Sequence, residues 1–557
     1  MPHLNPTLVT GWRPPWRHGR GAAAQAAVVL LALVLAAPVL ALLVAALGWN
    51  AESWAVLRAM ADTTLPGYAL TSVVVCVSVA VSVAVVGAAT AVAVTVFDFP
   101  GRRVAEWVLL LPLAMPAYVT AYAYTDFLQY AGPAQTWLRD TLGLQGRVLP
   151  DIRSTWGAVV VFTFTLYPYV YLLARTALTE RAAHLLEAAR LLGAPLGRRL
   201  RAVALPMARP AIAAGVALAL METLADFGVV SYFGVQTFTA GIYKAWLVMD
   251  DRVAAAQLAW MLLATVGALL WVEQRAQRRL RFAATRPGRG GVEAQPVRLR
   301  GRGAVVAWLV CGVPVLLGFG LPVLFMLRPL VQGWDVLPWQ AFLGWARNSV
   351  MLAGAAAMLT TAAALALGYA ARRLATPLVQ AAVRVVALGY AVPGAVIVVG
   401  LLLPLGWVQA RWPEATLAAW VTTTVLGVLW AYLVRFTAVA LQSVQSGYAR
   451  VPAHFDDAAR MLGVHGLALW RRVHWPLLRR AVLAAALLVF VDVMKELPAT
   501  LVLRPFNMDT LAVMAHQMAR DERLGEAALP ALTLVAVGLV PVMLLSRALR
   551  RGEANAC

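Results

Sequence analysis

The strongest constraint on the fold of this chain is a series of long apolar runs. Residues 22–48 contain no charged side chain, and eleven further runs follow. A transmembrane helix needs about 20 apolar residues. Of the 557 residues, 61% are hydrophobic and 13% are charged, a composition foreign to soluble globular proteins. We predict an all-α polytopic membrane protein with about twelve transmembrane helices, near residues 22–48, 68–96, 105–127, 156–178, 210–232, 253–272, 304–330, 348–371, 380–407, 416–440, 481–503 and 527–547.

The basic residues flank these runs. The formal net charge of +21 would suggest nucleic acid in a soluble protein, but here it indicates topology and contact with anionic lipid. With the N-terminus inside, Arg102, Arg103, Arg372 and Arg373 all fall on the inner side, and the outer loops carry few or balanced charges. We therefore predict the lipid bilayer, and no nucleic acid, as a partner, and both termini (1–21 and 549–557) in the cytoplasm.

The chain contains an internal repeat. Residues 184–212 and 454–482 align with a shift of 270 and no gap, and eleven of the 29 aligned positions are identical. Such a period indicates duplication of a structural unit. We predict two halves, 22–272 with a core at 65–272 and 304–548 with a core at 345–547, joined by a cytoplasmic linker at 273–303. An even number of spans in each half makes the repeat parallel.

Each copy has the same physical outline. An Ala/Leu-rich helix runs into Gly193 or Gly463, a residue that ends a helix in the left-handed conformation at little cost. A basic segment follows, and then Pro206 or Pro476 starts the next apolar run, where the first turn of a helix tolerates proline. One copy alone could be an amphipathic helix lying on lipid headgroups. Two copies in register favour a paired docking site for a partner that binds twice.

The pattern resembles the cytoplasmic coupling loop of ABC-transporter permeases. Its Glu-Ala-Ala, Gly and Pro positions match Glu187, Ala188, Ala189, Gly193 and Pro206 in loop 179–209, and Asp457, Ala458, Ala459, Gly463 and Pro476 in loop 441–480. The resemblance implies the type I importer (MetI-like) fold and two copies of an ABC ATPase. The sequence has no GxxxxGK[ST] phosphate loop. We therefore expect a transport subunit that is not an enzyme and binds no cofactor, with ATP used by a separate ATPase chain.

Four acids lie inside predicted spans. The same shift aligns Glu222 with Asp492 and Asp226 with Glu496. A charge near the bilayer centre costs roughly 3 kcal/mol, so each acid should face a partner or a cavity. The i, i+4 spacing predicts that the two acids of each half share one helix face. They are candidates either for structural pairing, for example with Lys495, or for contact with a passing cation.

Proline and aromatic residues mark individual spans. Pro112 and Pro116 in the third span and Pro393 in the ninth predict kinked or broken helices, which membranes tolerate where neighbours cover them. Tyr118 and Tyr122 lie near the end of the third span, a position typical of interfacial anchors.

Segments 232–246 and 496–511 resemble those of fused, two-domain ferric-iron permeases. That resemblance implies ferric iron as the substrate, a periplasmic binding protein as a partner and the bacterial inner membrane as the location. The same architecture also serves thiamine, phosphonate and other small solutes. A remote alternative from another class is an ion-driven secondary transporter, which would work without an ATPase.

Overall fold

The computed structural model describes residues 18–47, 50–179, 183–283, 296–374, 376–414, 416–449, 451–452 and 454–554. These residues are helical almost throughout. The strands among them are β1 (Phe97–Asp98) and β2 (Val297–Arg298), which pair in parallel. Most of the predicted N-terminal segment (1–17) and the centre of the predicted linker (284–295) lie outside the described residues.

Ten described helices are long and apolar enough to cross a membrane, or eleven if a bent pair counts as one span. The predicted all-α polytopic class is confirmed, with a count slightly below twelve. The third span is bent by 89° between Ala114 and Ala117, where Pro116 interrupts the helix. The eleventh ends at Met494 and carries Arg479, Arg480 and Asp492 within 20 residues. The third and eleventh spans therefore differ from the predicted continuous helices, the third because of a proline and the eleventh because of charged residues.

The contacts within the chain define two compact units, each built from three separate stretches of sequence. The larger comprises residues 38–356, 391–431 and 490–557, and the smaller comprises residues 1–37, 357–390 and 432–489. Four long helices run from one unit into the other: α1 (His18–Leu47), α16 (Trp339–Leu374), α20 (Leu426–Ala449) and α23 (Trp475–Met494).

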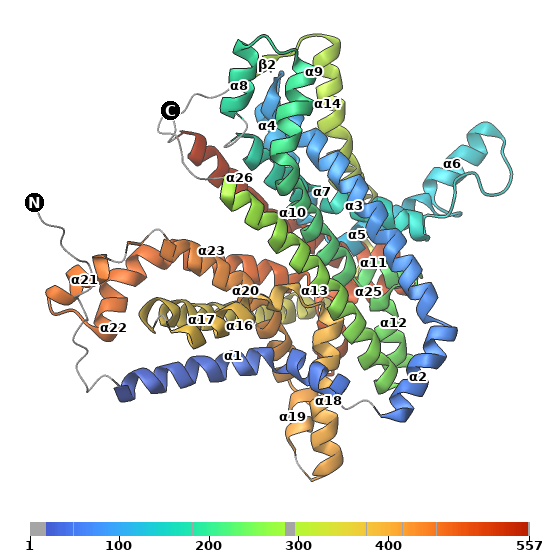
Figure 1. Cartoon of the computed structure of the whole chain (residues 1–557). Helices are drawn as coiled ribbons and strands as arrows, with labels where there is room; N and C mark the ends of the chain where they lie inside the picture. Colours follow the sequence, from blue (N-terminus) through green and yellow to red (C-terminus); the bar gives the residue numbers. More distant parts are fainter. Residues whose placement is uncertain are drawn as a thin grey trace, which may run out of the picture. The chain divides into compact units, whose positions relative to one another are not determined.

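The larger unit contains the whole core of the predicted first half (Figure 1). Its elements up to residue 283 are α2 (Ala51–Asp62), α3 (Leu65–Val96), α4 (Arg102–Val108), the 3₁₀ turn η2 (Leu111–Ala114), α5 (Ala117–Leu128), α6 (Pro133–Leu142), α7 (Thr155–Ala177), α8 (Ala183–Leu191), α9 (Leu196–Arg199), the π-helical turn η4 (Leu200–Ala204), α10 (Leu205–Ala225), α11 (Gly228–Tyr232), α12 (Phe238–Tyr243), the π-helical turn η5 (Lys244–Val248) and α13 (Arg252–Ala283). Helix α13 continues past residue 272, where the linker was predicted to begin.

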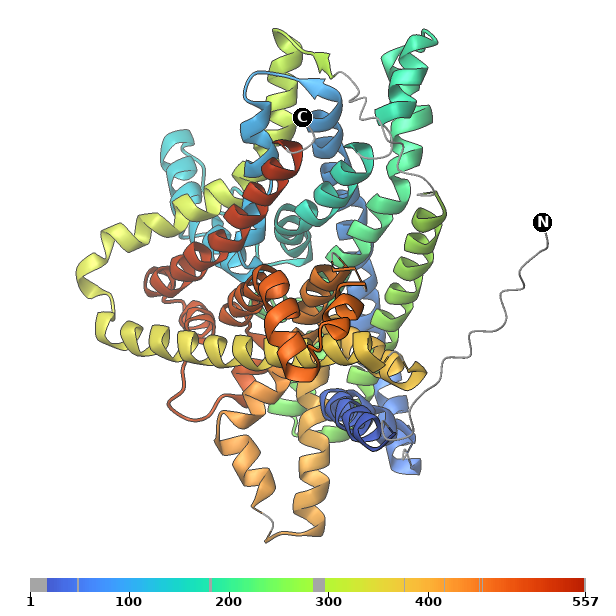
Figure 2. The same ribbon diagram turned by 90° about the vertical axis from the view of Figure 1, so that its left-hand side faces the viewer.

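The remaining elements of the larger unit come from the second half of the chain. They are α14 (Arg302–Val315), the π-helical turn η6 (Leu316–Gly320), α15 (Leu321–Gln332), the 3₁₀ turn η7 (Trp334–Val336), α18 (Gly394–Arg411), α19 (Leu417–Thr423), α24 (Pro498–Leu503), α25 (Leu511–Arg520) and α26 (Leu524–Ala554). Helices α15 and α26 pack side by side (Figure 2). The chain before α14 is fastened to the first half, because Leu299 donates its N–H to the carbonyl of Asp98 at 2.8 Å.

The smaller unit contains α17 (Pro377–Ala387), α21 (His454–Met461), α22 (Gly466–Leu469) and the π-helical turn η9 (Trp470–His474), together with parts of the four shared helices. A 3₁₀ turn, η8 (Gly389–Ala391), lies at its edge and precedes the break at Pro393. Gly368 allows α16 to approach α20, and Gly447 allows α20 to approach α23.

Close packing in the first half depends on two glycines that face one residue. A Cβ on Gly87 of α3 would lie 2.6 Å from Cβ of Val170 on α7, and one on Gly215 of α10 would lie 2.6 Å from Cα of Val170. Neither distance is allowed, so the backbones of α3, α7 and α10 meet only because both positions lack a side chain. This is the small-residue packing expected where helices associate in a membrane.

We expect Gly87→Ala and Gly215→Ala to destabilise the bundle by about 1–3 kcal/mol each, because the added methyl overpacks a filled space. Gly267→Ala on α13 is the matched control, since a Cβ there meets nothing within 4 Å. The measurement is thermal unfolding in detergent. Equal midpoints for the three variants would contradict this packing.

Candidate functional site: twin segments and two helix breaks

The two copies of the repeat fold alike, element by element. Helices α8, α9 and α10 with η4 have their counterparts in α21, α22 and α23 with η9, and both π-helical turns lie 270 residues apart, at Leu200–Ala204 and Trp470–His474. We call residues 183–209 the first docking segment and residues 454–479 the second. Residues 180–182, 450 and 453, which belong to the predicted loops, lie outside the described residues.

The predicted left-handed glycines are confirmed. Gly193 has φ +74° and Gly463 has φ +78°. In the first copy Gly193 donates its N–H to the carbonyl of Arg190 and Ala194 donates to that of Ala189, both at 3.0 Å. This pair of bonds is the Schellman motif, which satisfies the last carbonyls of a helix.

The second copy repeats the motif. The N–H of Gly463 bonds to Arg460 at 3.0 Å, and that of Val464 bonds to Ala459 at 2.9 Å. The first alanine of each pair also accepts a bond, from Leu192 to Ala188 and from Leu462 to Ala458. The twin alanines therefore supply the carbonyls that close each turn.

Each docking segment presents apolar side chains just before its glycine. Leu191 and Leu192 are 81% and 86% exposed, and Met461 and Leu462 are 89% and 82% exposed. The acid of each motif is held beside the same arginine, with Glu187 3.7 Å from Arg190 and Asp457 3.1 Å from Arg460. Pro206 and Pro476 are the second residues of α10 and α23, as predicted. Large exposed apolar side chains at matching places are typical of an interaction surface.

Two of the four intramembrane acids lie in helix breaks, and the other two lie on the helices just before them. Helix α10 ends at Ala225 and α23 ends at Met494, so Asp226 and Glu496 fall in the breaks and not on the helices. The expectation that the acids of each half share one helix face is therefore wrong. Glu222 lies on α10, and Asp492 on α23 forms an ion pair with Lys495 at 3.0 Å.

The acids in the breaks hold the start of the next short helix. Asp226 accepts the N–H of Val229 at 2.8 Å. Glu496, which is 5% exposed, accepts the N–H groups of Ala499 and Thr500 at 2.9 and 3.0 Å, and the Thr500 hydroxyl at 2.5 Å. Unpaired backbone N–H groups cost several kcal/mol in a membrane, so both carboxylates satisfy a structural need.

Aromatic residues bring the two breaks together within the larger unit. A Cβ on Gly228 would lie 2.5 Å from Cβ of Tyr118, and the Tyr118 hydroxyl donates to the carbonyl of Lys495 at 3.3 Å. The hydroxyl of Tyr243, in the first half, donates to the carbonyl of Pro498 at 2.6 Å. We call these groups the break cluster.

A buried tyrosine–histidine pair extends the break cluster. The Tyr122 hydroxyl lies 2.6 Å from Nδ1 of His516 on α25, and its ring lies 4.7 Å from that of Tyr232. Tyr118 is 5% exposed, and Tyr122 and His516 are fully buried. The interpretation of both tyrosines as interfacial anchors is therefore wrong. The sequence feature that points to burial is the i, i+4 spacing of Tyr118 and Tyr122, which places both rings on one face of the helix that follows Pro116.

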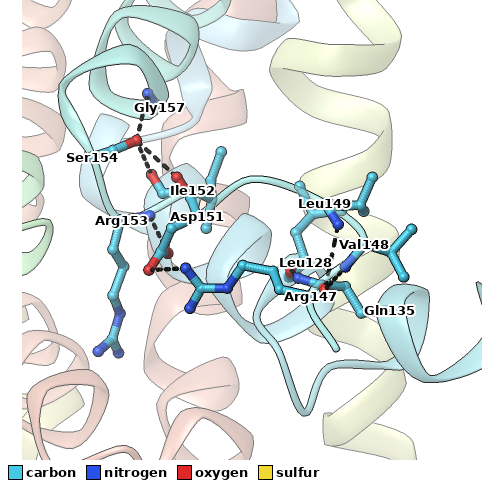
Figure 3. Close-up of polar contacts among 10 residues, drawn as sticks. All are labelled: Leu128, Gln135, Arg147, Val148, Leu149, Asp151, Ile152, Arg153, Ser154 and Gly157. Atoms are coloured by element: carbon cyan, nitrogen blue, oxygen red, sulfur yellow. Dashed lines mark hydrogen bonds and ion pairs between the residues drawn. The ribbon is translucent and has the colours of Figure 1, made fainter. Parts of the chain in front are cut away.

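A lobe connects α5 to α7 in the chain, and its polar contacts are shown in Figure 3. The buried amide of Gln135 on α6 donates to the carbonyl of Leu128 at 2.8 Å and accepts the N–H of Val148 at 3.1 Å, which closes the lobe. Ser154 accepts the N–H of Gly157 and begins α7. Next to it, Arg153 donates to the Tyr232 hydroxyl at 3.1 Å, which ties the lobe to the first helix break.

Comparison with known proteins places these features in a family. Residues 83–281 match the inner membrane component of binding-protein-dependent transport systems. Residues 83–281 therefore form a domain of a binding-protein-dependent ABC importer permease. The match covers the first docking segment and the first break, and it confirms the predicted MetI-like, polytopic architecture and the inner membrane as the location.

Several curated relatives are permeases. The Fe(3+)-transport system permease protein FbpB 2 of Haemophilus influenzae is 26% identical over 81% of this chain and 84% of its own length. A probable ABC transporter permease, y4fN of Sinorhizobium fredii, is 24% identical over 82% of this chain and 83% of its own. The sulfate permease CysT of Salmonella typhimurium is 33% identical, over 25% of this chain and 48% of its own length.

We expect Glu496→Ala to lower the stability of the permease by about 1–3 kcal/mol, because it leaves buried N–H groups without an acceptor. Asp492→Ala, which breaks a partly exposed ion pair four residues earlier, should cost less than about 1 kcal/mol. Thermal unfolding of the two variants in detergent makes the comparison. A larger loss for Asp492→Ala would contradict the capping role of Glu496.

Proposed function

We propose that this permease imports ferric iron, delivered by a periplasmic binding protein and driven by ATP hydrolysis on two copies of a separate ABC ATPase. The observation that carries the docking part is the matched pair of exposed apolar tips, Leu191–Leu192 and Met461–Leu462, each set on the same Schellman turn. Two equivalent surfaces on one chain suit a partner that binds twice. A short apolar helix laid into a partner groove is a common mode of recognition.

The orientation follows from the same proposal. If both docking segments face the cytoplasm, so do both termini, and the lobe at residues 129–154 faces the periplasm, where the binding protein would arrive. The charge distribution supports this orientation, since Arg102, Arg103, Arg372 and Arg373 would all lie inside.

The iron assignment is supported by the H. influenzae permease, whose similarity extends over both halves. The four acids at the helix breaks favour a cation, because carboxylate oxygens are natural ligands of hard metal ions. Glu222, Asp226, Asp492 and Glu496 remain pathway candidates, with Asp226 and Glu496 already engaged in capping.

An oxyanion is the second candidate. The sulfate permease of S. typhimurium and a putative 2-aminoethylphosphonate permease of the same species are 33% and 27% identical over a quarter to a third of this chain. The carboxylates of Asp226 and Glu496 in the breaks weigh against an anion, because like charges repel more strongly in a medium of low polarity.

Uptake by proteoliposomes containing the permease, its ATPase and its binding protein tests the substrate. We expect radiolabelled Fe(III) to accumulate in the vesicles only when ATP is supplied to the ATPase. Sulfate, phosphonate and thiamine should not accumulate. Accumulation of sulfate in place of Fe(III) would keep the importer and refute iron. Fe(III) uptake without ATP would refute the ATP-driven mechanism.

We expect Leu192→Asp and Leu462→Asp to weaken copurification of the ATPase about tenfold or more, because a charge replaces an apolar anchor. The matched control is Leu142→Asp, which changes a similarly exposed leucine on the outer lobe. Full ATPase recovery with the double variant would contradict the docking role of the two segments.

A further inference from the structure

The second docking segment is fastened to a membrane helix by a bidentate ion pair. Nε of Arg372, near the C-terminal end of α16, lies 2.8 Å from Oδ2 of Asp456, and its Nη2 lies 3.2 Å from Oδ1. The same guanidinium donates to the carbonyls of Val451 and Pro452 at 2.8 and 3.1 Å. One arginine therefore binds both the first turn of α21 and the chain that enters it. We call this arrangement the Arg372 clamp.

The clamp is sheltered and its charges are well placed. The side chains of Arg372 and Asp456 are 18% and 11% exposed. A cation at the C-terminal end of one helix and an anion in the first turn of another are each stabilised by the helix dipole. Planar pairing of a guanidinium with a carboxylate also fixes orientation, which a single lysine contact would not.

His474 also contacts Asp456. Its Nε2 lies 3.2 Å from Oδ1 of Asp456, and its ring lies 5.6 Å from those of Tyr369 and Tyr448. Burial lowers the pKa of His474 below its ordinary value of 6.5, with Arg372 and Arg460 adding to this effect and Asp456 opposing it. Burial thus favours the neutral form of the ring, and the charge that pairs with Asp456 comes from Arg372.

The first half uses the equivalent arginine differently. Arg102 occupies the position of Arg372 in the repeat, and its Nε lies 3.0 Å from Glu106, four residues ahead. Glu106 in turn lies 3.2 Å from Arg175 on α7. The first docking segment has Leu186 where the second has Asp456, and Ala204 where the second has His474. This clamp therefore cannot form in the first half.

We propose that the Arg372 clamp transmits movement of the second docking segment to α16, and that the two docking segments are consequently not equivalent in coupling. Helix α16 (Trp339–Leu374) is continuous, so at a rise of 1.5 Å per residue it extends about 50 Å from Arg372 to its first residue. A displacement of Asp456 moves Arg372 and with it the end of this rod. The inference rests on the proposed docking of an ATPase at residues 454–479.

Charge reversal in the full permease, reconstituted with its ATPase and binding protein, tests the clamp. We expect Arg372→Glu and Asp456→Arg each to lower Fe(III) uptake per ATP hydrolysed about tenfold, while the ATPase still copurifies. The double variant, which restores an opposite pair, should recover most of the ratio. Arg373→Glu is the matched control, because it makes the same charge change one residue away on an exposed side chain.

A second readout does not depend on the substrate. Leu343→Cys, an exposed position near the start of α16, is labelled with a thiol reagent in a chain whose three native cysteines are replaced by Ser. We expect ATP to change the labelling rate, and Arg372→Glu but not Arg373→Glu to abolish that change. If Fe(III) is not taken up but this pattern holds, the iron proposal fails and the clamp stands.

Three outcomes would overturn the clamp. The first is an unchanged labelling response and uptake ratio in both single reversals. The second is a double variant as defective as the single ones. The third is loss of the ATPase from the single variants, which would limit the ion pair to folding the docking segment.

Discussion

The need to satisfy backbone N–H groups where a helix breaks inside the membrane governs the centre of this permease. The hydrocarbon core of a bilayer offers no hydrogen-bond partners, so each break requires an acceptor within the protein. Asp226 and Glu496 provide it at positions 270 residues apart, each accepting the N–H of the residue three positions later. Once the breaks are stable, the chain can change direction, and Tyr118 and Tyr243 from the first half can bond to backbone carbonyls of the second break.

The sequence predicted those parts of the molecule whose physics is local. Gly193 and Gly463 end their helices in the left-handed conformation, and the hydrogen bonds that hold each turn come from the same short segment. The apolar runs predicted most helices for the same reason, since hydropathy and length suffice. The predicted third and eleventh spans differ because Pro116 and the charges of α23 act against a continuous apolar rod.

What the sequence did not predict depends on contacts between distant residues. Tyr122 and His516 are 394 positions apart, and nothing near either residue indicates the 2.6 Å contact between them. Tyr118 and Tyr122 are of the residue type that forms interfacial anchors in membranes. The packing of α5 against α11 and α25 places them in the interior instead. The acids were found from the repeat, but their capping role depends on where each helix ends, which hydropathy alone does not define.

Duplication followed by divergence explains why matching positions carry different interactions. Arg102 and Arg372 occupy the same place after the repeat shift, yet one binds Glu106 within its own half's membrane helices and the other binds Asp456 on a docking segment. The arginine is present in both copies, but its acidic partner differs between them. A fused chain permits this, because each half evolves with its own neighbours, whereas a homodimer must keep one sequence for both sites. Chemical asymmetry at the docking segments is therefore a direct consequence of joining the two halves in one polypeptide.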